Sequence, residues 1–270
     1  MSNIQSTTLD ELNSAISISP YLNEIDLSKL RKKPIDSRPL YICIDGMWNE
    51  EFLNKVAEES IHFDDWSGEK DFYGSRKKRW QSDIDKLPSF TKTFLAYLNQ
   101  STFLRVVEFL TDQEGLIPDP HFEGGGLHST GEGGFLKMHI DFNYNENLRL
   151  HRRVNVLVYL NKNWAKEYGG NFELATKDCK GNFKTLLSLE PIFNRTVIFI
   201  TDDSSYHGQP NPVMHPHKKR RNSIAAYYYL SDSNSKIKRT STNYFDNSGK
   251  PIKEKVLKKI LSKLKKSILH

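Results

Sequence analysis

The second half of this chain is a series of short strand-like segments separated by turn residues, and this pattern limits the fold more than any other feature. Glycines punctuate the segments, most densely between Gly124 and Gly134. We predict strands at residues 121–129, 135–141, 152–160, 171–175, 183–187, 196–201, 206–208 and 221–230. Many short strands without intervening helices predict a mainly β fold, a sandwich or barrel such as a jelly roll.

The first half has the spacing of helices instead. Apolar residues recur three and four positions apart over residues 47–60 and 89–109, which predicts helices that flank the β structure. A short strand is predicted at 41–44, and an aromatic-containing loop at 63–80. We therefore expect an N-terminal extension (1–40), a central domain (41–235) with helical support at about 47–110 and a barrel at about 118–232, and a C-terminal tail (236–270).

Composition excludes several classes of protein. With 270 residues and 37% hydrophobic content the chain can bury a sizeable core, and no apolar run is long enough to span a membrane. The two cysteines, Cys43 and Cys179, are far apart in the sequence, so no disulfide framework is expected. Few cysteines are typical of a reduced, cytoplasmic setting, which we predict for this protein. The net charge of +6 resides in the tail, where residues 250–270 carry eight lysines against Glu254 alone. The near-neutral remainder argues against nucleic-acid binding.

The tail itself has an amphipathic pattern. Apolar residues fall at four-residue spacing from Ile252 to Ile268, with lysines on the opposite face. Such a basic helix is typical of segments that lie on an anionic membrane surface or dock on a protein partner. The alternative is a helix that packs on the barrel or extends into solvent. We therefore predict a cytoplasmic protein, with peripheral attachment to a membrane through the tail as one option.

One spacing in the β half indicates a metal site. His139 and Asp141 are two residues apart, so on a strand they point to the same face, and His207 follows on a later strand. Two histidines and one carboxylate on one side of a metal leave positions open opposite, as in oxygen-activating non-haem iron(II) sites. We predict these three residues as the catalytic metal ligands.

A second pair of residues predicts an anion clamp. Arg221 and Ser223 share a face of the last predicted strand. Arg221 follows His207 by fourteen positions. A guanidinium binds a carboxylate bidentately, and a hydroxyl adds one hydrogen bond. Such a clamp suits the far end of a dicarboxylate that chelates a metal through its other end.

Several stretches together resemble the prolyl 4-hydroxylase-like branch of the iron(II)/2-oxoglutarate-dependent oxygenases. They are GGGLH (124–128), GGFLKMHIDFN (133–143), RRVNVLVYLN (152–161), YGGNFEL (168–174), FNR (193–195), YHG (206–208) and RNSIA (221–225). The resemblance implies a double-stranded β-helix (a jelly roll, or cupin-like barrel), bound iron(II), the co-substrates 2-oxoglutarate and O2, and ascorbate as an optional reductant. It implies metal ligation by His139, Asp141 and His207 and co-substrate binding by Arg221 and Ser223.

Four further residues are weaker candidates for substrate contacts. His128 precedes the metal strand, and Asn143 follows it. Arg153 is one of two adjacent arginines that alternate faces on a strand, and Trp80 ends the aromatic-containing loop. For each of them a structural role is the alternative: a satisfied histidine, a side-chain-to-backbone hydrogen bond, a surface ion pair or aromatic packing.

The leading functional prediction is hydroxylation of an unactivated C–H bond in a prolyl or other amino-acid substrate, free or peptidyl, with release of succinate and CO2. Asp141 favours hydroxylation over halogenation. In the related halogenases that the resemblance brings in, a small residue stands in place of this carboxylate and leaves room for chloride. The alternatives are a hydroxylase of a sugar or lipid-linked intermediate, a non-catalytic metal-binding barrel, and a zinc hydrolase. Arg221 and Ser223 argue against the hydrolase, which has no need of a 2-oxoglutarate pocket.

Overall fold

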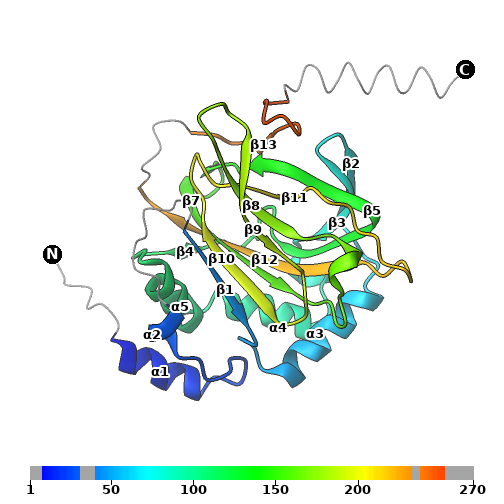
Figure 1. Ribbon diagram of the computed structural model, residues 1–270. Coiled ribbons are helices and arrows are strands. Elements are labelled where there is room, and N and C mark those ends of the chain that lie inside the picture. Colours follow the sequence, from blue (N-terminus) through cyan, green and yellow to red (C-terminus); the bar gives the residue numbers. More distant parts are fainter. Residues whose placement is uncertain (1–7, 31–39, 233–237, 253–270) are drawn as a thin grey trace, which may run out of the picture.

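The computed structural model describes residues 8–30, 40–232 and 238–252. Within them the helices are α1 (Leu9–Ser17), α2 (Leu27–Leu30), α3 (Glu50–His62), α4 (Ser89–Leu98) and α5 (Ser101–Thr111) (Figure 1). The strands are β1 (Tyr41–Asp45), β2 (Gly68–Phe72), β3 (Ser75–Gln81), β4 (Ile117–Pro118), β5 (Gly126–Ile140), β6 (Tyr144–Asn145), β7 (Leu150–Tyr159), β8 (Phe172–Lys177), β9 (Phe183–Leu189), β10 (Arg195–Ile200), β11 (Tyr206–Gln209), β12 (Arg221–Leu230) and β13 (Asn243–Tyr244). The predicted mainly β fold with flanking helices is confirmed.

The strands form one curled antiparallel sheet with the order β1-β10-β7-β12-β5-β11-β8-β9. The long strand β5 belongs to both halves of this order. Its residues 126–130 pair with β12, whereas its later residues pair with β11, where His139 lies opposite His207. Because one strand continues through both halves, the inner faces of the two halves enclose a space into which side chains from β5, β7, β11 and β12 project.

The helices cover the outer face of one half of this sheet (Figure 1). The main core cluster joins buried side chains of α3, α4 and α5, such as Leu53, Phe94 and Phe103, to Val156 of β7 and Ile224 of β12. The apolar stripes that predicted the helices are therefore the faces that contact the sheet. Burial of each such side chain contributes about 1.5–3 kcal/mol, so this layer fixes the strands that hold the site.

Two predicted boundaries differ from the structure. The helix expected at 89–109 is two helices, since α4 ends at Leu98 and α5 begins at Ser101. Apolar spacing continues across this break, so periodicity does not reveal it. The strands expected at 121–129 and 135–141 are one strand, β5. Its internal Gly134 packs so tightly that a Cβ atom there would lie 2.6 Å from the side chain of Thr130, so this glycine serves close packing within a strand.

The region predicted as a loop at 63–80 contains the hairpin β2–β3, which pairs with β5 through β3. The hairpin was missed because its two strands, GEKDF and SRKKRWQ, lack the alternation of apolar and polar residues that predicts strands. One of its faces is directed at a polar cavity and not at an apolar core, so both faces carry polar residues.

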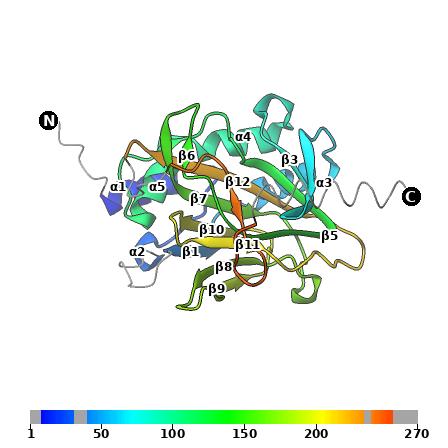
Figure 2. The same ribbon diagram turned by 90° about the horizontal axis from the view of Figure 1, so that it is seen from above.

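Parts of both ends of the chain pack on the central structure. Leu12, Ile16 and Leu27 of the N-terminal segment lie in the main core cluster. In the C-terminal segment, β13 pairs with β5 and lies over the open end of the barrel (Figure 2). The predicted basic helix of the tail falls outside the described residues, apart from Ile252. Within residues 8–30, 40–232 and 238–252 no helix combines the length and hydropathy of a membrane span.

Candidate active site

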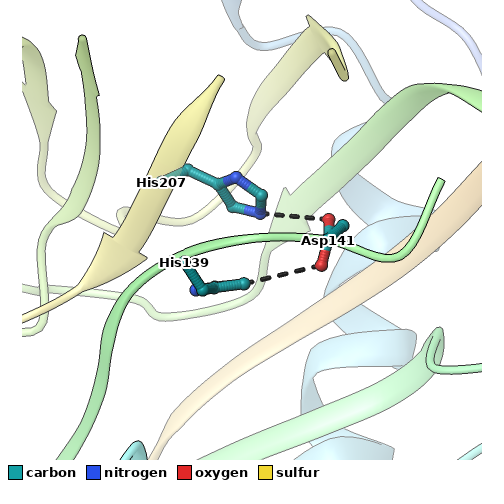
Figure 3. A group of neighbouring side chains, drawn as sticks. All are labelled: His139, Asp141 and His207. Carbon is teal, nitrogen blue, oxygen red and sulfur yellow. Dashed lines mark ion pairs between the residues drawn. The ribbon is translucent and has the colours of Figure 1, made fainter. Parts of the chain in front are cut away.

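Three side chains converge where β5 and β11 meet (Figure 3). His139 lies near the end of β5, Asp141 directly follows this strand, and His207 lies on β11 opposite His139. Gly208 allows the close approach of the two strands, since a Cβ atom there would lie 2.8 Å from the carbonyl oxygens of Leu136 and Lys137. The imidazole centroids are 4.3 Å apart, and all three residues can present ligand atoms within 4.8 Å of one another.

The hydrogen bonds of the two histidines identify which nitrogens face the site. His139 Nδ1 lies 2.8 Å from the carbonyl oxygen of Lys137, and His207 Nδ1 lies 3.0 Å from that of Ser205. A carbonyl only accepts, so both Nδ1 atoms donate, and in the neutral rings both Nε2 atoms carry lone pairs.

These lone pairs point at a carboxylate. His139 Nε2 lies 3.5 Å from Asp141 Oδ1, and His207 Nε2 lies 3.1 Å from Asp141 Oδ2. Lone pairs that face a carboxylate repel it, and a metal cation bound between them replaces this repulsion with attraction. The donor set of two imidazoles and one carboxylate is the one that non-haem iron(II) uses. The residues present therefore fit an iron(II) ion.

Electrostatics keep these groups in their metal-binding protonation states. Burial, with the neighbouring His207, lowers the pKa of His139 to about 4, so this ring is neutral at physiological pH. Burial would raise the pKa of Asp141, but the positive charge of Arg152 holds that pKa well below its usual range. A neutral imidazole and an ionised carboxylate need not release protons when a metal binds.

The carboxylate of Asp141 is held from behind by two side chains of β7. Arg152 Nη2 lies 2.8 Å from Asp141 Oδ2, and the amide of Asn155 donates to the same oxygen at 2.9 Å. Arg152 Nε donates in turn to Asn155 Oδ1 at 2.8 Å. Arg152 also stacks on Tyr227, with its guanidinium carbon 3.4 Å from the ring centroid. This buried network fixes the orientation of the one anionic ligand.

A cavity of about 310 Å³ opens in front of the three residues. Its lining includes Arg221, Ser223 and Tyr159, together with the apolar side chains of Phe172 and Phe199. Arg221 Nε donates to the carbonyl oxygen of Gly170 at 2.7 Å, which positions the guanidinium 4.9 Å from the ring centroid of Tyr159. The Tyr159 hydroxyl is buried and makes no hydrogen bond of good geometry, although it interacts with the neighbouring guanidinium of Arg221. A buried hydroxyl of this kind beside a guanidinium suits an anionic ligand.

Of the four weaker candidates, His128 alone lines this cavity. Its Nε2 lies 3.1 Å from the carbonyl oxygen of Gly125, and burial holds the pKa of His128 well below its usual range. The other three do not line it. Arg153 donates to Gln113 Oε1 at 2.6 Å, Asn143 Oδ1 accepts from the backbone amide of Arg239 at 2.7 Å, and Trp80 lies beside the ammonium of Lys70.

The C-terminal segment contributes a wall that the strand pattern did not predict. Thr240, Ser241, Thr242 and Tyr244 line the cavity, and the Tyr244 ring lies 5.4 Å from that of His139. Arg239 fastens this segment, because its Nε donates to the Asp141 carbonyl oxygen at 2.9 Å and its Nη1 pairs with Asp203. Nothing in the residue pattern of 238–245 indicates this role, which depends on a contact between distant parts of the chain.

Comparison with known proteins agrees with this geometry. Residues 125–229 match the family model described as the 2OG-Fe(II) oxygenase superfamily. Similar solved structures include a prolyl hydroxylase from Trichoplax adhaerens in complex with a hypoxia-inducible-factor peptide fragment (19% identity, 83% of this chain and 94% of that chain, TM-score 0.53). A second is a prolyl-4-hydroxylase from Pseudomonas putida (17% identity, 77% of this chain and 100% of that chain, TM-score 0.51). A third comes from work on prolyl 4-hydroxylases of Phytophthora capsici (18% identity, 86% of this chain and 70% of that chain, TM-score 0.53).

The structural matches confirm the double-stranded β-helix that the sequence resemblance implied. The family model covers the stretch that contains His139, Asp141, His207, Arg221 and Ser223. The cofactor of this family is iron(II), and its co-substrate is 2-oxoglutarate. The matched residues and the His–Asp–His geometry together assign residues 125–229 to the 2OG-Fe(II) oxygenase superfamily, in a chain whose fold is the double-stranded β-helix of the prolyl hydroxylases.

Proposed function

We propose that the protein hydroxylates an unactivated C–H bond of an amino-acid substrate, with proline or a prolyl residue as the leading candidate. In this reaction 2-oxoglutarate, O2 and the substrate become succinate, CO2 and the hydroxylated product. One oxygen atom of O2 enters succinate, and the other enters the new hydroxyl group. The single observation that carries the proposal is Asp141, which completes the donor set with His139 and His207 in the wall of the cavity.

The residues of the cavity divide this task. His139, Asp141 and His207 would hold iron(II), which with 2-oxoglutarate supplies the activation of O2 needed to remove a hydrogen atom from carbon. Arg221, with Ser223 and the buried hydroxyl of Tyr159, would bind the distal carboxylate of 2-oxoglutarate.

The surrounding side chains protect this chemistry. Phe172 and Phe199 line the cavity, and the Phe199 ring centroid lies 4.8 Å from that of His207. Apolar side chains of this kind exclude water, which strengthens the electrostatic contacts inside. Support for an amino-acid substrate comes from the prolyl hydroxylases that share the fold, one of which is in complex with a peptide fragment.

The deciding experiment is an anaerobic titration of the metal-free protein with iron(II) and 2-oxoglutarate, in which the visible charge-transfer band of the chelate is followed. The wild-type protein should develop the band, and the His207→Ala variant should not. Succinate release on addition of O2 and proline-containing probes then tests hydroxylation. A folded, metal-loaded wild-type protein that forms no band would exclude the proposed chemistry and favour a non-catalytic barrel.

A further inference from the structure

The cavity carries an excess of positive charge. Four side chains that can carry positive charge line it, Lys70, Lys78, Arg152 and Arg221, against the carboxylates of Glu123 and Asp141, which leaves two positive charges uncompensated when Lys78 is protonated. Iron(II) and the 2-oxoglutarate dianion would cancel each other's charge and leave this excess in place. A cavity with such a balance attracts anions and disfavours cations.

Two of the four cations have clear tasks. Arg152 pairs with Asp141, and Arg221 faces the proposed 2-oxoglutarate pocket. The remaining two, Lys70 and Lys78, have no carboxylate within 4.0 Å among the residues that the structure describes. Their charges are therefore available to a ligand.

The hairpin β2–β3 places these two lysines directly opposite each other. Lys70 pairs in register with Lys78, whereas the adjacent pair, Glu69 and Arg79, forms an ion pair at 2.6 Å. Neighbouring cross-strand pairs point to opposite faces, so the hairpin has a neutralised outer face and a doubly cationic inner face. Like charges directly opposite each other destabilise a hairpin, which is the arrangement expected when a bound anion lies between them.

The surroundings of the lysines also favour an anion. Lys70 is exposed and Lys78 is half-buried. Partial desolvation lowers the pKa of both ammonium groups, and the charge of Lys70 lowers the pKa of Lys78 further. Thr240, Ser241 and Thr242 also line the cavity and carry no formal charge. The cavity of about 310 Å³ is at the small end of the range for ligand sites, and it must also hold 2-oxoglutarate. The space that remains fits a small molecule.

We propose that the substrate is a small molecule with a carboxylate or phosphate group, and that this oxyanion binds between Lys70 and Lys78. The inference rests on the proposed hydroxylation and narrows its substrate class. A free amino acid presents such a group as its α-carboxylate, and a phosphorylated sugar presents it as a phosphate. In both cases the lysine pair would fix the anionic end and leave the remainder of the molecule toward His139, Asp141 and His207.

The test uses matched probes that differ in charge. The full chain is loaded anaerobically with iron(II) and 2-oxoglutarate and is titrated with N-acetyl-L-proline or its amide, and with glucose 6-phosphate or glucose. Perturbation of the charge-transfer band gives each Kd. At least one anionic probe should bind about tenfold or more tightly than its neutral partner, as expected for charge-assisted hydrogen bonds. The proline pair reports a carboxylate site, and the glucose pair reports a phosphate site.

Variants identify the residues responsible. Lys70→Gln/Lys78→Gln should abolish the preference for the anionic probe and leave the Kd of 2-oxoglutarate unchanged, with Lys70→Gln alone as a milder form. Arg79→Gln, on the outer face of the same hairpin, is the matched control and should retain the preference.

Three outcomes would overturn the anion site: equal binding of charged and neutral probes, no binding of either anionic probe, or a double variant that loses affinity for 2-oxoglutarate instead. The last outcome would assign the lysines to the co-substrate. Failure of the proposed function is distinguishable, because then the wild-type protein forms no charge-transfer band in the first place.

Discussion

The guanidinium of Arg152 lies 2.8 Å from Asp141 Oδ2, while its neighbour Arg153 donates to Gln113. The pair of adjacent arginines thus divides into one residue that positions a metal ligand and one that does not. Orientation by partners behind the ligands contributes strongly to metal affinity in proteins.

We expect Arg152→Gln to weaken metal binding by about 10–100-fold, because Asp141 loses the contact that fixes its orientation. Anaerobic titration with cobalt(II), followed by its visible absorption, measures this change. Arg153→Gln is the matched control and should bind cobalt(II) as the wild-type protein does. Unchanged affinity in Arg152→Gln would show that Asn155 alone suffices to orient Asp141.

Tyr159→Phe should separate stability from co-substrate binding. The Tyr159 hydroxyl is buried and makes no hydrogen bond of good geometry, so its removal should leave the free energy of unfolding unchanged or raise it by about 1 kcal/mol. The same change should weaken 2-oxoglutarate binding by about tenfold, because one hydrogen bond to a carboxylate is lost. Thermal unfolding and the Kd for 2-oxoglutarate provide the two measurements. A variant with lower stability and normal 2-oxoglutarate affinity would assign Tyr159 a purely structural role.

Lys78→Met should stabilise the ligand-free protein. The change removes one of two like charges that lie opposite each other and replaces it with an apolar side chain of similar length. We expect a gain of about 1 kcal/mol, which corresponds to a rise in Tm of roughly 2–4 °C. Lys77→Met serves as the comparison, since the Lys77 ammonium donates to the Glu132 carbonyl oxygen at 2.9 Å and its loss should not stabilise the protein. A lower Tm for Lys78→Met would contradict the idea of a strained lysine pair.

Binding of the anionic probe should weaken as the pH rises through neutrality. Burial and the charge of Lys70 lower the pKa of Lys78 to about 7, so this ammonium is charged below that pH and neutral above it. The charges of Arg221 and Arg152 also lower the pKa of Lys78, whereas the charge of Asp141 raises it. Lys78 in turn lowers the pKa of His128.

Because the charged form binds the oxyanion, the Kd of the preferred probe should increase between about pH 6 and about pH 8.5. The Lys78→Gln variant lacks the group and should show a flatter profile. A wild-type Kd that does not change over this range would exclude Lys78 as the titrating anion ligand.

Local patterns in the sequence were sufficient to predict two pairs of side chains that share a strand face. His139 and Asp141 share a strand face by simple alternation, and Arg221 and Ser223 do the same on a second strand, so each pair follows from a two-residue period. The helices at 50–62, 89–98 and 101–111 followed from apolar spacing, apart from the break between the last two, because the side chains that create the pattern are those that contact the sheet. These features depend on neighbours in the chain, and therefore the sequence by itself determined them.

The tertiary structure decided which polar residues join the site. Alternation shows that Arg152 and Arg153 face opposite ways, but only the packing of β7 between β10 and β12 decides which of them meets Asp141. Lys70 and Lys78 occur in strands without apolar alternation, and residues 240–244 reach the cavity through the pairing of β13 with β5. Contacts between segments so far apart in the chain leave no local period, because polar residues that line a cavity need not follow the spacing that burial in a core imposes on apolar ones.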